Sequence, residues 1–542
     1  MNKIILLMLL VCLSCMKVSS QCAETPVTRV LLVGDSWAFF LNAEATIDTA
    51  LRRAGLSNYK FFSNANLSVS GATTGNFIDS AGQAEIKNQL NANPTIDFCH
   101  LSIGGNDFLG GWDTTFTPGQ TDTLFAYVFH RIDSIVRFIK TCRPGIKVLW
   151  SSYCFTNFKE SIETSIAPTS HPFYSTWSGM KFPDFLQINP MQNLISTRFR
   201  AYADTTPDLY FVDCNGLMQN VYGQTTALMV PPGGTYPAGT AAIDTGIVAY
   251  PSPLVSMRDY GIFKDCYHLS TDGYRYQLAY HCQKFYQKAM MDDLYLLSDS
   301  TQTGSVSAQG NVSNVPTLGQ TGSDTFSTVL SFNTTSMADT TLSKASIFLK
   351  RQSLTGGNPL NGSVNVRVKS GNFGSSVTVE AADYSASGDA AGTPCLFGAN
   401  EANDEWVRLD LPPAILSHIN HTAITQFIIS APGVSAAGEN FYGSSNPDFA
   451  PFLNLKYGPA PNAIREIPAD EFSVSPNPSN GLLVIKGNEI VIKVDVTNLL
   501  GETVLHPQLN QQAIDISSLT PGMYILNITT KSGVALKKVV KE

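Results

Sequence analysis

The sequence has little charge and no excess of basic residues. Only 14% of its 542 residues are Asp, Glu, Lys or Arg, and the formal net charge is −8. Proteins that bind nucleic acid through its phosphates carry a basic surface, which this composition does not supply. We therefore expect no nucleic-acid partner. The small charged fraction is typical of an exported protein.

Long apolar runs are scarce as well. Residues 1–20 carry Lys3 near the start, an apolar core at Ile4–Leu13 and a small-residue end, which predicts a signal peptide cleaved before Gln21. The core is shorter than the roughly 20 residues that a membrane-spanning helix needs. A retained anchor and a lipoprotein site at Cys15 are the alternatives. No later run is long enough to span a membrane, so we expect no transmembrane segment in the mature chain.

Metal and cofactor motifs are missing. The sequence has no His-Glu-x-x-His and no Walker loop, and its Cys-x-x-Cys pair falls inside the leader. The glycine pairs at 104–105 and 110–111 do not form a dinucleotide fingerprint. We therefore expect no cofactor and no catalytic metal.

Eight cysteines follow the leader. Export favours disulfides, but eight cysteines allow too many pairings for the sequence to select one. Cys154 and Cys214 each follow an expected strand and are candidates to be neighbours. Cys99 stands inside an apolar strand, so we expect it to be a buried free thiol.

Strands and helices alternate from Arg29 to about residue 297. We expect strands at 30–33, 59–63, 97–103, 147–152 and 209–213, and helices at 38–54, 124–141 and 274–297. This alternation is typical of a parallel sheet with helices on both faces. Two long segments, 155–190 and 215–262, interrupt it. Such loops often shape substrate pockets, and surface insertions without a role are the alternative.

The composition changes near residue 300. Residues 298–323 are rich in Ser, Thr and Gly, which predicts a linker or a first edge strand. From 324 to 457 apolar and polar residues alternate, and this period predicts a β-sandwich. The region resembles the jelly-roll modules of secreted polysaccharide-active enzymes, which implies carbohydrate binding. Trp406 is then either a sugar platform or, as is more frequent for tryptophan, a core residue.

A third region closes the chain. Residues 458–470 form a Pro-rich linker, and short strands with tight turns are expected from 471 to 542. The segments Phe472–Pro478, Val494–Gly501 and Pro521–Tyr524, in this order, resemble the C-terminal sorting domain of type IX secretion cargo. The resemblance implies a Gram-negative host, export through the periplasm by the type IX machinery, and release or attachment at the cell surface. One more adhesive β-module is the alternative.

Polar residues suited to catalysis stand in four blocks of the first region: Gly34-Asp35-Ser36-Trp37, Ser70–Thr74, Gly104–Asp107 and Asp265–His268. The first block follows a buried strand and opens a helix, which places Ser36 at a sheet edge where ligands bind. Together the blocks resemble the GDSL, or SGNH, hydrolase family, with Trp in the place of Leu. The resemblance implies a three-layer α/β/α, flavodoxin-like fold.

The residue types suit acyl transfer. A serine hydroxyl needs a base to remove its proton, and a histidine held by a carboxylate supplies one. The expected triad is Ser36, Asp265 and His268. The resemblance assigns the oxyanion hole to the backbone N–H groups of Ser36 and Gly71 and to the side-chain amide of Asn106.

Other polar residues have plainer interpretations. We expect Asp35 to cap a helix, Asp107 to be structural and Asp272 to mark a helix start. Four histidines lack a motif context and are expected to be ordinary core or surface residues: His100, His130, His171 and His281.

The sequence thus predicts a secreted serine esterase. It would hydrolyse acyl esters, acetyl among them, through an acyl-Ser36 intermediate, and the sandwich favours acylated polysaccharide as the substrate. A lipase or lysophospholipase is one alternative. A surface glycan-binding protein or adhesin without activity is the other.

Overall fold

The computed structural model describes residues 22–224, 234–338, 340–419, 421–433, 436–458, 471–487, 489–499, 502–510, 512–530 and 534–542. The expected signal peptide and nearly all of the expected linker at 458–470 lie outside the described residues. The chain divides into two compact units, residues up to 336 with 345–455, and residues 337–344 with 456–542. Within the described residues, no helix has both the length and the apolar character to cross a membrane.

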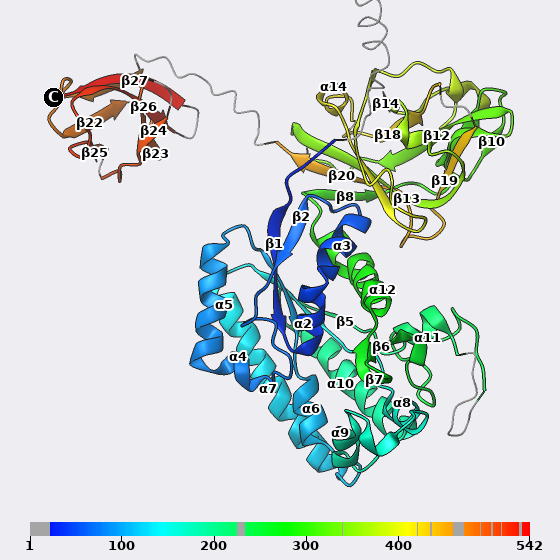
Figure 1. Ribbon diagram of the computed structural model, residues 1–542. Coiled ribbons are helices and arrows are strands. Elements are labelled where there is room, and N and C mark those ends of the chain that lie inside the picture. Colours follow the sequence, from blue (N-terminus) through cyan, green and yellow to red (C-terminus); the bar gives the residue numbers. More distant parts are fainter. Residues whose placement is uncertain are drawn as a thin grey trace, which may run out of the picture. The chain divides into compact units, whose positions relative to one another are not determined.

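A parallel five-stranded sheet organises the first part of the chain (Figure 1). Its strands lie in the order β2-β1-β3-β4-β5. Their bounds are β1 Val27–Gly34, β2 Tyr59–Phe62, β3 Phe98–Ser102, β4 Lys147–Ser151 and β5 Leu209–Val212. Each coincides with an expected strand. This order is that of the flavodoxin-like fold, so the expected fold class is confirmed.

Helices cover both faces of this sheet. Strand side chains alternate between the faces, and β1 accordingly sends Val30 and Leu32 into one core and Leu31 and Val33 into the other. The first core includes α2 (Ser36–Ala43), α3 (Thr46–Arg53) and α12 (Thr271–His281); the second includes α5 (Ser80–Ala92), α7 (Pro118–Cys142) and α10 (Phe185–Thr205). Shorter helices are α4 Gly75–Ile78, α6 Gly105–Gly111, α8 Phe158–Glu163, α9 Tyr174–Gly179 and α11 Leu217–Tyr222.

Two expected helices are wrong in extent. The helix expected at 38–54 is broken at Ala45, which adopts a left-handed backbone with φ of 48°. No glycine or proline marks that break in the sequence. The helix expected at 274–297 ends with α13 (Gln287–Ala289), and the apolar β8 (Leu294–Leu297) pairs instead with β20 (Phe452–Tyr457). A short apolar run fits either structure, and here the available strand partner decides.

Helix α10 begins inside a segment that was expected to be a loop. The long segment expected as a loop runs to Pro190, yet α10 already begins at Phe185 and contains that proline. A capping box between Asp184 and Gln187 starts the helix, and its buried face packs on the sheet. Proline therefore did not mark the helix boundary.

An all-β region of antiparallel strands follows. Its strands are β9 Gly304–Ser307, β10 Val312–Ser313, β11 Thr317–Thr321, β12 Asp324–Asn333, β13 Leu342–Gly356, β14 Asn365–Ser370, β15 Ala390–Gly392, β16 Cys395–Phe397, β17 Trp406–Asp410, β18 Ile424–Ser430, β19 Ala437–Phe441 and β20. Residues 298–323, expected as a linker or an edge strand, contain β9 to β11. The long β13 pairs with β17 over Ser346–Lys350 and then with β19. A strand that changes partners in this way connects two sheets.

Trp406 is a core residue. Its side chain is 7% exposed and packs with Phe348 and Phe452 against Leu51 and Ala54 of the first domain. The all-β region and the α/β domain therefore share one apolar core. The interpretation of Trp406 as a core residue is confirmed by its burial in this cluster.

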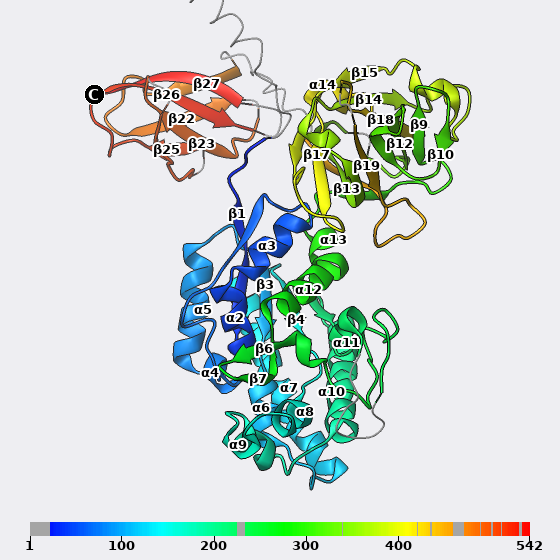
Figure 2. The ribbon, with the colours of Figure 1, turned by 45° about the vertical axis from the view of Figure 1, so that its right-hand side comes forward.

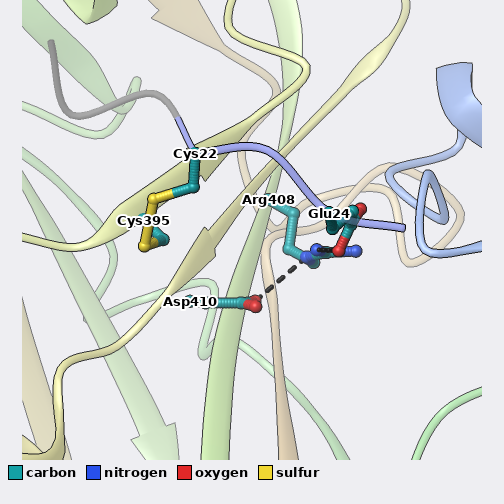
Figure 3. Close-up of a disulfide and its surroundings, with 5 residues drawn as sticks. All are labelled: Cys22, Glu24, Cys395, Arg408 and Asp410. Atoms are coloured by element: carbon teal, nitrogen blue, oxygen red, sulfur yellow. Dashed lines mark hydrogen bonds and ion pairs between the residues drawn. A yellow bond between two sulfur atoms is a disulfide. The ribbon is translucent and has the colours of Figure 1, made fainter. Parts of the chain in front are cut away.

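The residues before β1 are fastened to the all-β region (Figure 3). Cys22 forms a disulfide with Cys395, a pairing that the sequence left open. Two residues on, Glu24 lies 2.5 Å from the buried guanidinium of Arg408, whose Nε lies 3.0 Å from Asp410. Arg408 also donates to Asn58 Oδ1 at 2.9 Å, so one cation links three segments.

The second compact unit contains a small β-domain. Its strands are β21 Phe472–Ser475, β22 Leu482–Gly487, β23 Lys493–Thr497, β24 Thr503–Leu505, β25 Ala513–Asp515, β26 Gly522–Thr529 and β27 Val534–Lys541. They form a three-stranded and a four-stranded antiparallel sheet. Alternate residues such as Val494, Val496 and Leu526 fill its core. The short strands expected for this region are thereby confirmed.

Removing the disulfide should lower stability without affecting a site at the far end of β1. A bridge that closes so long a loop contributes typically about 2–5 kcal/mol. We expect the double variant Cys22→Ser/Cys395→Ser to unfold at lower urea concentration than the parent. Reductant should shift the parent to the same midpoint and leave the double variant unchanged. Equal midpoints for oxidised parent and double variant would contradict this.

Candidate active site

The site forms where the strand order reverses. In a sheet of order 2-1-3-4-5 the crevice between the carboxyl ends of β1 and β3 is open for a ligand. Ser36 follows β1 and Asn106 follows β3. Gly34 lets the two strands approach, because a Cβ there would lie 1.9 Å from the carbonyl oxygen of Ser102. Any larger residue would push β1 away from β3.

Ser36, His268 and Asp265 form one hydrogen-bonded chain. The Nε2 of His268 lies 2.7 Å from Ser36 Oγ, and its Nδ1 lies 2.8 Å from Asp265 Oδ2. All three side chains are buried or nearly so. The structure therefore brings the three residues of the expected triad together, although 232 positions separate Ser36 from His268.

The carboxylate is held by its own backbone. Asp265 lies on β7 (Phe263–Leu269), which forms a hairpin with β6 (Met257–Tyr260). Its Oδ1 accepts the N–H groups of Tyr267 and His268, both at 3.0 Å. Its other oxygen is thereby directed to the imidazole. This contact favours the His268 tautomer that carries its proton on Nδ1 and leaves Nε2 free to accept one.

Asn106 and Gly71 occupy adjoining turns. The side-chain amide of Asn106 donates to the carbonyl of Ala72 at 2.8 Å, which holds it against the segment that carries Gly71. Gly71 has φ of +81°, a conformation that favours glycine. An amide nitrogen has two hydrogens, so Asn106 keeps a second donor beyond this bond.

Asp107 joins the second and third sequence blocks. Its carboxylate accepts the backbone N–H of Thr74 at 2.8 Å and the Thr74 hydroxyl at 2.6 Å. The structural role expected for Asp107 is confirmed. The bond fixes the turn of Gly71 relative to the helix α6 that carries Asn106.

Asp35 caps α2, as expected, and has a second partner. Its Oδ1 accepts the Trp37 N–H at 3.0 Å, and its Oδ2 accepts the hydroxyl of Tyr153 at 2.5 Å. Tyr153 in turn accepts the N–H of Gly105. Burial raises the pKa of Asp35 to about 6, although both hydrogen bonds favour its charged form. No motif in the sequence marks Tyr153, and its place shortly after β4, at the same sheet edge, is the available signal.

A cavity of about 80 Å³ adjoins Ser36. Its wall includes Asp35, Asn106 and Tyr153 at one end, and it continues beneath α6, α7 and α10. Two residues of the long segments that interrupt the expected pattern, Thr156 and Asn215, also contribute to it.

The remaining expectations for polar residues hold. Asp272 lies in the first turn of α12, where Ser270 is the cap. His100, His171 and His281 are buried, and His100 contacts the Tyr286 hydroxyl. Cys99 is a buried free thiol, and Cys154 and Cys214 are free thiols as well. In the described part of the chain, no cluster of His, Cys, Asp or Glu has the arrangement of a metal site.

Comparison with known families decides the identity. Residues 32–276 match the GDSL-like lipase/acylhydrolase family, and residues 473–542 match the secretion system C-terminal sorting domain. The first domain is a GDSL-like acylhydrolase. The sorting domain indicates type IX secretion to the cell surface or the extracellular space. The search of curated proteins finds no match.

Solved structures with GDSL-type folds align with the acylhydrolase domain. A carbohydrate esterase of family 3 from Talaromyces cellulolyticus aligns at 13% identity over 48% of this chain and 97% of its own, with a TM-score of 0.28. A GDSL-like lipase from Bacteroides thetaiotaomicron aligns at 15% identity over 48% and 88%, with a TM-score of 0.26. A carbohydrate acetylesterase from Sinorhizobium meliloti aligns at 15% over 48% and 99%, with a TM-score of 0.28. These values do not discriminate among substrates.

The raised pKa of Asp35 makes a prediction for stability. A carboxyl group whose pKa is higher in the folded state destabilises that state as it ionises, so its cost appears as pH rises from about 4 through 6. The shift corresponds to roughly 3 kcal/mol at neutral pH, at about 1.4 kcal/mol per pH unit. Asn cannot ionise, so the unfolding free energy of Asp35→Asn should rise by about that much relative to the parent's between pH 4 and pH 7. Urea unfolding across this range measures the difference.

The surface variant Asp272→Asn is the matched control for the loss of one carboxylate. If the difference in unfolding free energy between Asp35→Asn and the parent stays constant from pH 4 to pH 7, burial of Asp35 does not have this cost.

Proposed function

We propose that the acylhydrolase domain cleaves acyl esters through a covalent acyl-Ser36 intermediate. The observation that carries the proposal is the continuous chain from Asp265 through His268 to Ser36, with contacts of 2.8 and 2.7 Å. In this geometry His268 Nε2 can take the Ser36 proton during attack. Asp265 stabilises the imidazolium that results.

The oxyanion would form between β1 and β3. The N–H groups of Ser36 and Gly71 and the second hydrogen of the Asn106 amide are its proposed donors. Loss of one such donor typically costs about 3–4 kcal/mol of transition-state stabilisation. The proton on His268 then passes to the leaving alcohol. Water attacks the acyl-enzyme by the same steps in reverse, and a protein base suffices, so we expect no metal requirement.

The alcohol side of the substrate is open between two classes. An acylated polysaccharide was favoured by the appended β-region, but the buried Trp406 removes its best candidate for a sugar platform. The contacts between the all-β region and the residues before β1 lie at the start of that strand. Eight residues of strand, about 26 Å, separate this end from Ser36. A lipid ester is therefore an equal candidate. The remaining alternative is a glycan-binding protein without activity, which hydrolysis of a test ester would exclude.

We further propose how the chain is organised for export. A signal peptide at 1–20 would deliver it to the periplasm of a Gram-negative bacterium, and residues 471–542 would engage the type IX machinery. Residues 21–297 would form the hydrolase and 324–457 the appended β-domain, with 298–323 contributing strands to it.

Replacing the nucleophile should abolish turnover. We expect Ser36→Ala to lower kcat for a chromogenic acetate ester by at least about 10⁴-fold, because the residual site can only bind and polarise the substrate. Ser134→Ala, on the outer side of α7, is the matched control and should keep the parent rate. EDTA should leave the parent rate unchanged. Equal rates for Ser36→Ala and parent would instead favour the binding protein.

Deleting the tail should stop export. In a host with a type IX system, the chain without residues 471–542 should accumulate in the periplasm as an active esterase. The full chain should appear at the surface or in the medium. Cell fractionation with an esterase assay measures the distribution, and secretion of the truncated chain would overturn the proposed role of the tail.

A further inference from the structure

The cavity beside Ser36 is closed by apolar side chains from several elements. Its apolar lining consists of Phe108 and Leu109 of α6, Phe125, Val128 and Phe129 of α7, Trp150 of β4, and Ile195 and Phe199 of α10. These residues belong to a strand of the sheet and to helices that cover it; Figure 2 shows these elements. The cavity therefore reaches into the layer between sheet and helices rather than along the surface.

Residues of the proposed catalytic site line this cavity. Ser36 and Asn106 both belong to its wall, and so does Tyr153, which is fixed by its bonds to Asp35 and Gly105. An ester carbonyl held between Ser36 and Asn106 would have one substituent directed inward and the other toward solvent. The inward substituent would meet the apolar wall.

The wall selects against charge. Among the described residues that line the cavity, no lysine or arginine occurs, and Asp35 supplies the one carboxylate, already engaged by Trp37 and Tyr153. Uncharged polar side chains also line the cavity, but a charged group would lose its hydration there without an opposite charge to compensate it. These side chains are Ser152, Thr156, Gln192, Ser196 and Asn215. A hydrocarbon chain would gain about 0.8 kcal/mol for each methylene it buries.

The size of the cavity sets the length of the chain. A water takes up about 30 Å³ in the liquid and a methylene is close to water in size, so about 80 Å³ accommodates about three such groups. An acetyl group would leave most of the space unfilled.

We propose that this cavity binds the acyl chain of the ester, and that the chain is an unbranched aliphatic one of about four carbons. The inference rests on the proposed acyl-ester function and refines its substrate. The competing occupant is water, because the buried Thr156 hydroxyl in the same wall has no partner in the described structure. Hydration would leave the cavity without influence on chain length.

The test is a series of p-nitrophenyl esters from acetate to laurate, assayed below their critical micelle concentrations. For the full chain kcat/KM should rise about three- to fourfold per methylene, the equivalent of about 0.8 kcal/mol. It should reach a maximum near butyrate and fall beyond it.

Filling the cavity should shorten the preferred chain. Val128→Phe places a ring in the cavity, so the ratio of kcat/KM for butyrate to kcat/KM for acetate should fall about tenfold relative to the parent. Val312→Phe makes the same change on the exposed β10 and should alter neither. Retained acetate hydrolysis also shows that the variant is folded. If Val128→Phe does not fold, Leu109→Trp tests the same point, since Leu109 is a partly buried residue of the same wall.

The outcomes separate this inference from the proposed function. Absence of hydrolysis for every ester would overturn the proposed function itself. Acetate as the best substrate, with a decline for each added methylene, would keep that function and overturn the acyl cavity. Val128→Phe with the same chain-length profile as the parent would overturn it as well.

Discussion

The close contact between His268 and Ser36 is the interaction on which the site depends. It requires β1 to lie beside β3, which Gly34 permits, and it requires the β6–β7 hairpin to fold back over the carboxyl edge of the sheet. Asp265 meets the second requirement locally, since one of its oxygens binds the backbone of His268 and the other binds the ring. An ion pair of 2.8 Å between Arg258 of β6 and Glu44, at the end of α2, also joins the hairpin to the helix that carries the nucleophile.

The all-β region supports the opposite end of the same sheet. Its aromatic residues Phe348, Trp406 and Phe452 enter the core of the acylhydrolase, and Arg408 and the Cys22–Cys395 disulfide fasten the residues before β1. This arrangement stabilises the start of the strand whose other end carries the nucleophile. A disulfide is consistent with the secretion that the sorting domain indicates. The thiols left free and buried lie inside the acylhydrolase core.

Much of the fold could be predicted from the sequence, because strongly apolar strands and four ordered motifs fix both the sheet and the triad. What could not be predicted depends on tertiary partners. Leu294–Leu297 is a strand only because β20 is present to pair with it, and the break at Ala45 has no local residue that marks it. Tyr153 and the cavity under α10 escaped for the same reason: each depends on packing between segments far apart in the chain. The role of Trp406 followed from burial, which a single tryptophan in a sequence does not reveal.

The central claim is that Ser36 is a nucleophile activated by His268. Reaction with a fluorophosphonate tests it most directly, since the reagent labels only an activated serine and needs no assumption about the natural ester. Intact mass followed by peptide mapping should find one label per chain, on the peptide that contains Ser36, and labelling should slow by orders of magnitude in His268→Ala. A folded chain that takes no label, or takes it on another serine at an unchanged rate in His268→Ala, would contradict the account.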